Sequence, residues 1–428
     1  PPTPADDSAG AASPSESAAP SEPSLPDMMQ PLFASWQTTW PGEAREGVVF
    51  PGRLAGYLLI KNLGAGKYGQ VWKARVLDAK GALQGVEEVA LKFMNPNLTA
   101  EEKRSFRSEL LVLRVLANYE HEHDLCQDGY SLVPYLYETK DETEAAPFPE
   151  FFTEALAQGT PLDALRSQQG AQPEAVAVQI IEQLCRVLEA LHQGVRRSYL
   201  DFQPRNVFWN NKTGRIMVID WNLLSTEARI DPAADIRSAT QELYRLLMGV
   251  TPPAPGSRRA LAEPRAAWDK LSRGAQDILA KAFHPTQAYP SVVELRQTLE
   301  ILVHAWKLSP QELYSELQQR QSGLPNAANH ISWEDFEILR PYAWAVDILD
   351  KRSALAADGS LKYEISRLRR EVEGWISGKV WIERGRGFFI EAGSLESARE
   401  CLDRAREDVQ TELEAVRWLQ AVEGARQK

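Results

Sequence analysis

The feature that most constrains the fold is a change of hydrophobic periodicity along the chain. Residues 54–94 form three strand-like runs, AGYLLIKNL, GQVWKARVL and EEVALKFM, separated by glycines. Residues 99–120 then place apolar side chains three and four apart after a Thr99-x-x-Glu102 capping box, which predicts a helix. Two further strand-like runs follow, and from about Pro173 the pattern is mostly helical. We therefore predict an α+β protein in which a β-rich lobe precedes a larger helical lobe.

Length and composition are compatible with such a protein and exclude other classes. The 428 residues are 43% hydrophobic and 25% charged, which are ordinary values for a soluble globular chain. The formal charge of -11 provides no overall basic surface, so we expect neither nucleic acid nor a membrane as partner. Three widely spaced cysteines and the lack of a long apolar run favour a reducing, cytoplasmic location.

The two ends of the chain differ in composition from its middle. Residues 1–50 are rich in proline, serine, alanine and acidic side chains, so we predict a disordered acidic leader. Residues 310–428 are charged and have helical periodicity, which predicts a mainly helical C-terminal extension. Within this extension, apolar residues from Leu395 to Leu419 predict one helical stripe, whereas residues 379–386 are strand-like.

Three glycines, Gly64, Gly66 and Gly69, lie between the first two strand-like runs. The cluster lacks the Lys and Ser or Thr of a Walker A loop, and a strand follows it where a Rossmann fold has a helix. It fits a strand-turn-strand flap over nucleotide phosphates, because missing side chains let the backbone approach a ligand closely. Taken alone, the same three glycines are also compatible with an ordinary turn.

Charged residues of a matching kind follow in order. Lys92 shares a strand face with Ala90, so its ammonium can reach phosphates while the small residue packs against a base. Glu109 lies in the next helix, at a position from which its carboxylate can orient that ammonium. This spacing favours a nucleotide site over an isolated strand lysine that faces solvent.

Two aspartates and an asparagine complete the set. Asp201 can orient a nucleophilic hydroxyl, and Asn206 and Asp220 offer the hard oxygen ligands that Mg²⁺ prefers. Each residue alone is compatible with a turn. Their ordered combination with the glycines and the lysine points to phosphoryl transfer.

This ordered set resembles the eukaryotic-type protein kinase family, which also occurs in bacteria. The resemblance covers about Leu54 to Val303 and implies a bilobal kinase-like domain at 54–303, with an N-lobe at 54–156 and a C-lobe at 157–303. It also implies ATP and Mg²⁺ as cofactors. The residues that the resemblance assigns are Gly64, Gly66, Gly69, Val71, Ala90, Lys92, Thr153, Glu154 and Leu156 for ATP binding, Asp201, Lys92, Glu109 and Arg205 for catalysis, and Asn206 and Asp220 for metal binding.

The sequence departs from the family at several of its motifs. Tyr199 and Gln203 stand where the family has a histidine and a lysine, and Asp220-Trp221-Asn222 replaces Asp-Phe-Gly. The segment from Asp220 to Asp235 is too short for the usual activation loop and contains no Ala-Pro-Glu. Switching by activation-loop phosphorylation is therefore not expected, and the substrate must be recognised elsewhere.

The function that the sequence predicts is an ATP- and Mg²⁺-dependent phosphotransferase, a protein serine/threonine kinase. Two alternatives stay open. One is a nucleotide-binding pseudokinase that serves as a scaffold, because of the motif departures. The other is a small-molecule kinase, because Val218-Ile-Asp-Trp also resembles the metal-binding segment of aminoglycoside and choline kinases. We expect a protein substrate or partner, which the 310–428 extension could bind.

Overall fold

The chain folds into two compact units. The computed structural model describes residues 43–122, 131–140, 149–199, 202–221, 231–254, 258–284, 288–321, 333–353, 359–391, 393–408 and 411–427. The first unit comprises residues 1–95 together with 137–153, and the second comprises residues 96–136 together with 154–428. The predicted leader lies outside the described residues as far as position 42, and so does the predicted catalytic Asp201.

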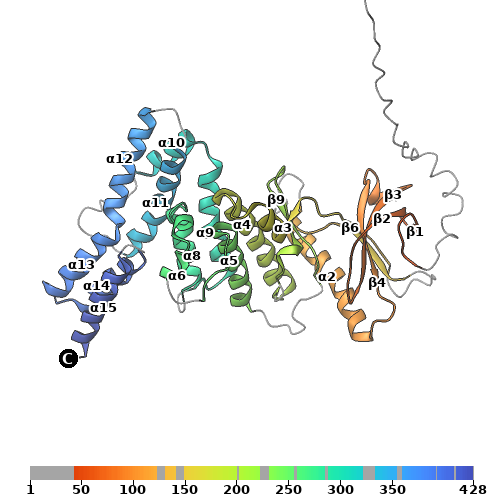
Figure 1. The fold of residues 1–428 in the computed structure, drawn as a ribbon, viewed down its shortest axis with the longest axis horizontal. Helices are drawn as coiled ribbons and strands as arrows, with labels where there is room; N and C mark the ends of the chain where they lie inside the picture. Colours follow the sequence, from red (N-terminus) through yellow and green to blue (C-terminus); the bar gives the residue numbers. More distant parts are fainter. Residues whose placement is uncertain are drawn as a thin grey trace, which may run out of the picture. The chain divides into compact units, whose positions relative to one another are not determined.

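The first unit is built on a six-stranded sheet of order β1-β2-β3-β4-β6-β5 (Figure 1). The first four strands pair antiparallel with their neighbours, as the three glycine-separated runs predict. A short 3-10 helix, η1 (Gly81–Leu83), lies between the third and fourth strands. The strand bounds are β1 Val49–Pro51, β2 Gly56–Ala65, β3 Gly69–Leu77, β4 Glu88–Met94, β5 Leu136–Lys140 and β6 Phe151–Ala155.

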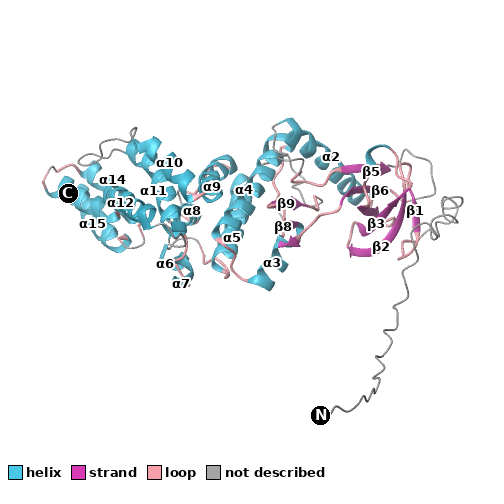
Figure 2. Ribbon diagram, turned by 90° about the horizontal axis from the view of Figure 1, so that it is seen from above, coloured by secondary structure: helices cyan, strands magenta, loops and turns pink. Residues whose placement is uncertain are grey.

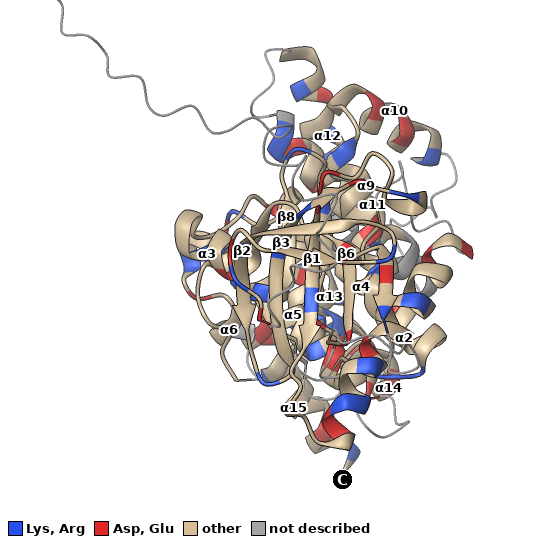
Figure 3. Ribbon diagram, turned by 90° about the vertical axis from the view of Figure 1, so that its right-hand side faces the viewer, with Lys and Arg blue, Asp and Glu red and all other residues tan. Residues whose placement is uncertain are grey.

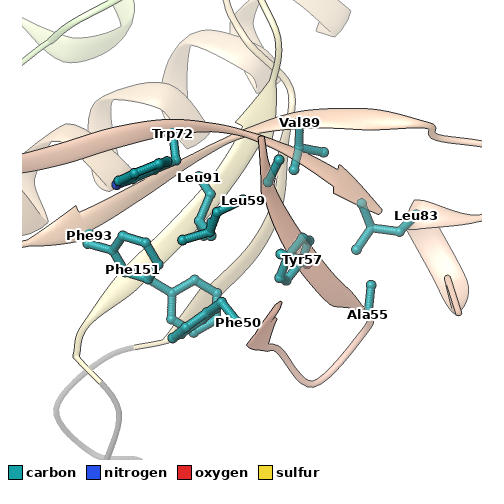
Figure 4. Packing of buried hydrophobic residues seen from close by; sticks show 11 residues of the cluster. Phe50, Ala55, Tyr57, Leu59, Trp72, Leu83, Val89, Leu91, Phe93 and Phe151 are labelled. Atoms are coloured by element: carbon teal, nitrogen blue, oxygen red, sulfur yellow. The ribbon is translucent and has the colours of Figure 1, made fainter. Parts of the chain in front are cut away.

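An aromatic and aliphatic core packs on one face of this sheet (Figure 4). The ring of Phe50 lies edge-on to Phe93 and Phe151, with centroids 4.7 and 4.8 Å away. Leu91 and Trp72 are cross-strand partners within this core. Because side chains alternate along a strand, the residues between these core positions face the other side of the sheet.

The second unit is predominantly helical (Figure 2). It begins with α2 (Ala100–Glu122), whose predicted capping box is present: the Thr99 backbone N–H donates to Glu102 Oε2, and the Glu102 N–H donates to Thr99 Oγ1. Strands β7, β8 and β9 form a small three-stranded sheet. The other bounds before the extension are β7 Thr160–Pro161, α3 Leu162–Gln169, α4 Glu174–Ala190, the π-helical turn η3 Leu191–Val195, η4 Pro204–Asn206, β8 Val207–Asn210, β9 Arg215–Val218, α5 Pro232–Met248, α6 Arg258–Leu261, α7 Arg265–Trp268, α8 Arg273–Ala282 and α9 Val292–Lys307.

The C-terminal extension is helical, as predicted, and belongs to the same compact unit as α4 to α9. Its helix α11 packs against α8 and α9. Figure 3 shows acidic and basic residues along α10, as the charged sequence of this helix requires. The bounds are α10 Pro310–Gln321, α11 Trp333–Ser353, α12 Gly359–Ile376, α13 Gly378–Ile390, α14 Leu395–Arg406 and α15 Glu412–Arg426.

Two sequence predictions within the extension were wrong. The stripe from Leu395 to Leu419 is divided between α14 and α15, and Leu413 is 51% exposed. On either side of this division, Asp408 accepts the Gly378 N–H and Thr411 Oγ1 donates to the Ala405 carbonyl.

The segment at residues 379–386 is part of helix α13 and is not a strand. Its apolar residues Trp381 and Ile382 enter a core shared with α14 and α15. Gly385 faces the same core, because a Cβ there would lie 2.6 Å from Leu402 Cγ. Tertiary packing of one helical face therefore decides the structure of a segment whose local pattern is ambiguous.

The architecture confirms the predicted fold class, a strand-rich N-terminal part followed by a mostly helical C-terminal part with a helical extension. The exact domain boundaries stay predictions. Among the described residues, no helix is both long and apolar enough to span a membrane.

Candidate active site

The three glycines occupy a hairpin between β2 and β3. The Gly66 N–H donates to the Gly69 carbonyl at 2.8 Å and closes the turn. Asn95, just beyond β4, holds the tip: its N–H donates to the Tyr68 carbonyl at 2.9 Å, and its Nδ2 donates to the Lys67 carbonyl at 3.3 Å. The hairpin is thus attached to the strand that carries Lys92.

The glycines differ in what the structure demands of them. A Cβ at Gly69 would lie 1.8 Å from the Phe93 carbonyl oxygen, so strand packing alone requires glycine there. A Cβ at Gly64 or at Gly66 would meet no described atom within 4 Å, and neither residue has a positive φ. Internal packing therefore explains Gly69 and leaves room at the other two for a ligand that approaches the backbone.

Lys92 lies on the sheet face opposite the aromatic core. Its cross-strand partner is Val71, and Ala90 lies on the same face two residues earlier in β4. Ala90 and Lys92 are 6% and 7% exposed, and Lys92 Nζ lies 5.6 Å from the centroid of the Phe152 ring. The structure thus brings three predicted ATP-binding residues together on one face of β3 and β4.

The predicted adenine-edge residues follow from strand β6. Thr153 is fully buried, Glu154 is 7% exposed and Leu156 is half-buried. The Ala155 N–H donates to the Tyr135 carbonyl at 2.8 Å, which fixes the chain as it leaves the strand. Their contacts with a nucleotide remain predictions.

In the helical unit, backbone pairing joins the two predicted metal-ligand segments. Asn206 ends the 3-10 turn η4 and is 8% exposed. Its carbonyl accepts the Ile219 N–H at 2.9 Å, so Asn206 is tied to the residue before Asp220. The β8–β9 hairpin between these segments has its turn at residues 211–214. This backbone hydrogen bond therefore brings the Asn206 segment next to the Asp220 segment, although the hairpin separates them in the sequence.

Asp220 has a left-handed backbone, with φ of +65°. This conformation is uncommon outside glycine and is tolerated best by Asn and Asp, and such residues cluster at functional sites. The buried Tyr199 hydroxyl donates to the Asp220 carbonyl at 3.1 Å and lies 3.4 Å from the Ile219 carbonyl oxygen. The Tyr199 and Trp221 ring centroids are 5.2 Å apart. The two rings and the hydroxyl hold the backbone around Asp220.

Glu109 binds the same segment from helix α2. It is 1% exposed, and its Oε1 accepts the Trp221 N–H at 3.3 Å. Sequence reasoning assigned Glu109 only as a partner of Lys92 and missed this bond, because a contact between a helix and a remote backbone N–H leaves no local pattern. Lys92 belongs to the first unit and Glu109 to the second, and their pairing stays a prediction.

Side chains of Asp235, His192 and Ser198 anchor the surrounding chain. Asp235 Oδ2 accepts the Tyr199 N–H at 3.0 Å and lies 2.6 Å from His192 Nε2. Ser198 Oγ accepts the Asp231 N–H at 2.5 Å. Together these bonds tie the start of α5 to the residues that precede Asp201. The resemblance to protein kinases implies Asp235 as the aspartate that opens a central helix of the C-lobe, whereas nothing in the sequence indicates His192 or Ser198.

Of the two remaining predicted catalytic residues, only Arg205 lies within the described part of the chain. Arg205 is exposed at the surface of η4. Asp201 lies outside the described residues. Among the described residues, no group of three His, Cys, Asp or Glu side chains forms a metal cluster. Asn206 and Asp220 do not need such a cluster to bind Mg²⁺, because Mg²⁺ is commonly held by one or two carboxylates together with substrate phosphates.

Comparison with known proteins agrees with this geometry. Residues 58–235 match the family described as protein tyrosine and serine/threonine kinase. The chain therefore contains a protein kinase domain over these residues, which include the glycine hairpin, Lys92, Glu109, Asn206 and Asp220. No curated protein matches the chain.

Proposed function

We propose that the chain is an ATP- and Mg²⁺-dependent protein kinase that phosphorylates serine or threonine. The observation that carries this proposal is the assembled segment around Asp220. Its backbone is fixed by the Tyr199 hydroxyl, by the Glu109 carboxylate and by the pairing of Ile219 with Asn206. A scaffold that binds no nucleotide has no evident need to hold an acidic residue in a left-handed conformation beside a buried asparagine.

The residues present fit the two cofactors. The backbone at Gly64 and Gly66 has open space beside it, which suits close approach to phosphates. Asn206 and Asp220 supply oxygen ligands suited to Mg²⁺. When bound, Mg·ATP supplies the transferable phosphoryl group and the positive charge that stabilises the transfer.

The roles of the residues follow from their chemistry. Lys92 binds phosphate oxygens, and Glu109 orients the Lys92 ammonium. Asp201 orients the substrate hydroxyl and accepts its proton. Arg205, next to Asn206 in η4, adds positive charge where negative charge gathers during transfer. These assignments rest on the family resemblance and on the arrangement within each unit.

The test uses the purified full chain with Mg²⁺ and radiolabelled ATP, followed by phosphoamino-acid analysis of the chain itself and of a mixed protein substrate. We expect phosphoserine or phosphothreonine, and a loss of labelling of about 10³-fold or more in Asp201→Asn and Asp220→Asn. Asp269→Asn, at an exposed position directly after α7, serves as the matched carboxylate control and should label normally.

A thermal-unfolding measurement with and without Mg·ATP separates the alternatives. Stabilisation by the nucleotide without labelling of any protein would favour the pseudokinase scaffold. Labelling of an added small alcohol or aminoglycoside, but not of protein, would favour a small-molecule kinase. Equal labelling by the wild type and by Asp201→Asn would exclude the proposed mechanism.

A further inference from the structure

Two neighbouring residues, Ser198 and Tyr199, hold the chain on both sides of the short segment that follows Asp220. On the first side, the Tyr199 hydroxyl donates to the Asp220 carbonyl at 3.1 Å. On the second side, the Asp231 N–H donates to Ser198 Oγ at 2.5 Å, and we name this hydrogen bond the serine clamp. Residues 222–230 lie outside the described part of the chain, whereas both anchored ends are described. The two ends are therefore fastened to one place in the chain.

The residues on either side of Ser198 are themselves fixed. The Arg197 N–H donates to the carbonyl of Leu191 in η3 at 3.4 Å. The Tyr199 N–H donates to Oδ2 of Asp235, which is buried at the start of α5, at 3.0 Å. Ser198 is fully buried between these two bonds. Its hydroxyl oxygen therefore offers the incoming chain an acceptor in a fixed position.

Capping of helix α5 does not require the Ser198 hydroxyl. Asp231 is the N-cap residue of α5, and its own Oδ1 accepts the Ala234 N–H at 3.2 Å. The Asp231 N–H that Ser198 accepts precedes the helix and is not one of its backbone donors. An alanine would fill nearly the same volume as Ser198 without burying a hydroxyl that needs a partner. The serine clamp therefore fixes the point at which the chain reaches α5.

Asp220 needs such support from the chain that follows it. Its φ of +65° lies in the left-handed region, which costs free energy and persists only where surrounding contacts enforce it. The Trp221 N–H donates to Glu109 Oε1 at 3.3 Å, which is longer than the usual range and is a weak restraint by itself. The next described residue is Asp231, where the serine clamp holds the chain. Loss of the clamp would lengthen the unrestrained chain beyond Trp221 and give it more conformations.

We propose that Ser198 is a positioning residue for phosphoryl transfer: by accepting the Asp231 N–H it restrains the chain that follows Asp220, so that the Asp220 carboxylate is held ready for Mg²⁺. This inference rests on the proposed function. It supplies a fixed anchor for a segment that is too short for the usual activation loop and that is not expected to be switched by phosphorylation. Ser198 is assigned no contact with the nucleotide and acts through Asp220.

The first measurement needs neither activity nor a cofactor. Hydrogen exchange of the full chain is followed in overlapping peptides by mass spectrometry, for the wild type, Ser198→Ala and Ser272→Ala. Ser272 is the matched control, because it is also fully buried and its Oγ accepts the Ala275 N–H at the start of α8 at 3.2 Å. Ser198→Ala should speed exchange at Asp231 and, by at least about threefold, at the Trp221 N–H. Ser272→Ala should leave exchange at both positions unchanged.

The second measurement is the Mg²⁺ concentration that gives half-maximal binding of a fluorescent, non-hydrolysable ATP analogue, followed by anisotropy. Ser198→Ala should need at least about threefold more Mg²⁺, because Asp220 is less well restrained, and should lower kcat more than it raises KM for ATP. Ser198→Cys has nearly the size of serine but is a weak acceptor, so it should behave like Ser198→Ala. Ser198→Thr keeps the hydroxyl and should keep the wild-type Mg²⁺ requirement, with thermal unfolding as the check that each variant folds.

The outcomes separate this inference from the proposed function. Unchanged exchange at Trp221 or an unchanged Mg²⁺ requirement in Ser198→Ala would overturn the inference, even if the wild type phosphorylates protein. A raised Mg²⁺ requirement in this variant, when the wild type binds nucleotide but labels no protein, would support the clamp and contradict the kinase function. Changes of equal size in Ser272→Ala would also overturn the inference, because a general loss of stability would then explain them.

Discussion

At the scale of single residues, the glycines of the β2–β3 hairpin are explained by different physical constraints. Gly69 is fixed by packing, because any Cβ there would collide with the Phe93 carbonyl oxygen. Gly66 has open space beside it and a backbone that other residues can adopt. Three glycines that look equivalent in the sequence thus divide into one required by the fold and two left free for a ligand.

This difference predicts that replacement by alanine affects stability at Gly69 but hardly at Gly66. Gly69→Ala should lower the free energy of unfolding by about 2 kcal/mol or more, because the backbone must move to accept the methyl group. Gly66→Ala should change it by less than about 0.5 kcal/mol while weakening stabilisation by Mg·ATP. Urea unfolding with and without nucleotide measures both. Equal destabilisation by the two variants would show that packing does not distinguish them.

The hydroxyl of Tyr199 offers a second residue-scale prediction. Tyr199→Phe removes the donor to the Asp220 and Ile219 carbonyls, so it should cost about 1 kcal/mol of stability and also weaken Mg·ATP binding. Tyr244→Phe is a matched control, since this buried hydroxyl donates to the Leu261 and Glu263 carbonyls. The control should lose similar stability but bind nucleotide normally, as thermal shifts can measure. Unchanged nucleotide binding in Tyr199→Phe would mean that the hydroxyl does not position Asp220.

At the scale of elements, buried polar groups connect helices that are distant in sequence. Glu174 at the start of α4 accepts the Ser272 N–H at 2.6 Å, the Ser272 hydroxyl at 2.5 Å and the Trp306 Nε1–H at 3.1 Å. Burial raises the pKa of this carboxyl, while its bonds to Ser272 and Trp306 act in the opposite direction. One carboxyl thus joins α4, the start of α8 and the end of α9.

The raised pKa of Glu174 fixes the sign of a pH effect. The folded chain retains the carboxyl proton of Glu174 more readily than the unfolded chain does. The contribution of Glu174 to the free energy of unfolding is therefore greatest at low pH and falls as pH rises through the pKa of the folded state. The stability of the wild type relative to Glu174→Gln should therefore increase as pH is lowered from 7 towards 5. Urea titrations at several pH values measure the difference. A relative stability that decreases over this range would contradict the prediction.

At the scale of the whole molecule, the extension is built into the helical unit. Trp344 of α11 is 3% exposed, and its Nε1 donates to Asp277 of α8 at 2.9 Å. A Cβ at Gly274 would collide with Leu302 Cδ2 of α9 and would lie 3.0 Å from the Trp344 ring, so glycine makes room for both side chains. Asp347 of α11 accepts the Arg273 N–H at the start of α8 at 2.7 Å. The extension therefore completes the packing and the capping of helix α8.

This packing predicts that damage to the extension also destabilises helix α8. Trp344→Ala should lower the free energy of unfolding by about 3–5 kcal/mol and speed hydrogen exchange in α8 as well as in α11. Tyr363→Ala, at a 63% exposed position, should change stability by less than about 0.5 kcal/mol. Faster exchange confined to residues 310–428 would show that the extension folds separately from α8.

The sequence by itself determined most of the elements and their order, and it identified the residues of the candidate site. Strand runs, the Thr99 capping box and the ordered motifs act locally, so they can be read from spacing alone. The tertiary structure decided which remote groups meet: Glu109 with the Trp221 N–H, Tyr199 with the Asp220 carbonyl, and Ser198 with the Asp231 N–H. It also divided the stripe at residues 395–419 and made residues 379–386 helical. These outcomes depend on long-range packing, because a local pattern compatible with two structures is settled only by the surface it can bury.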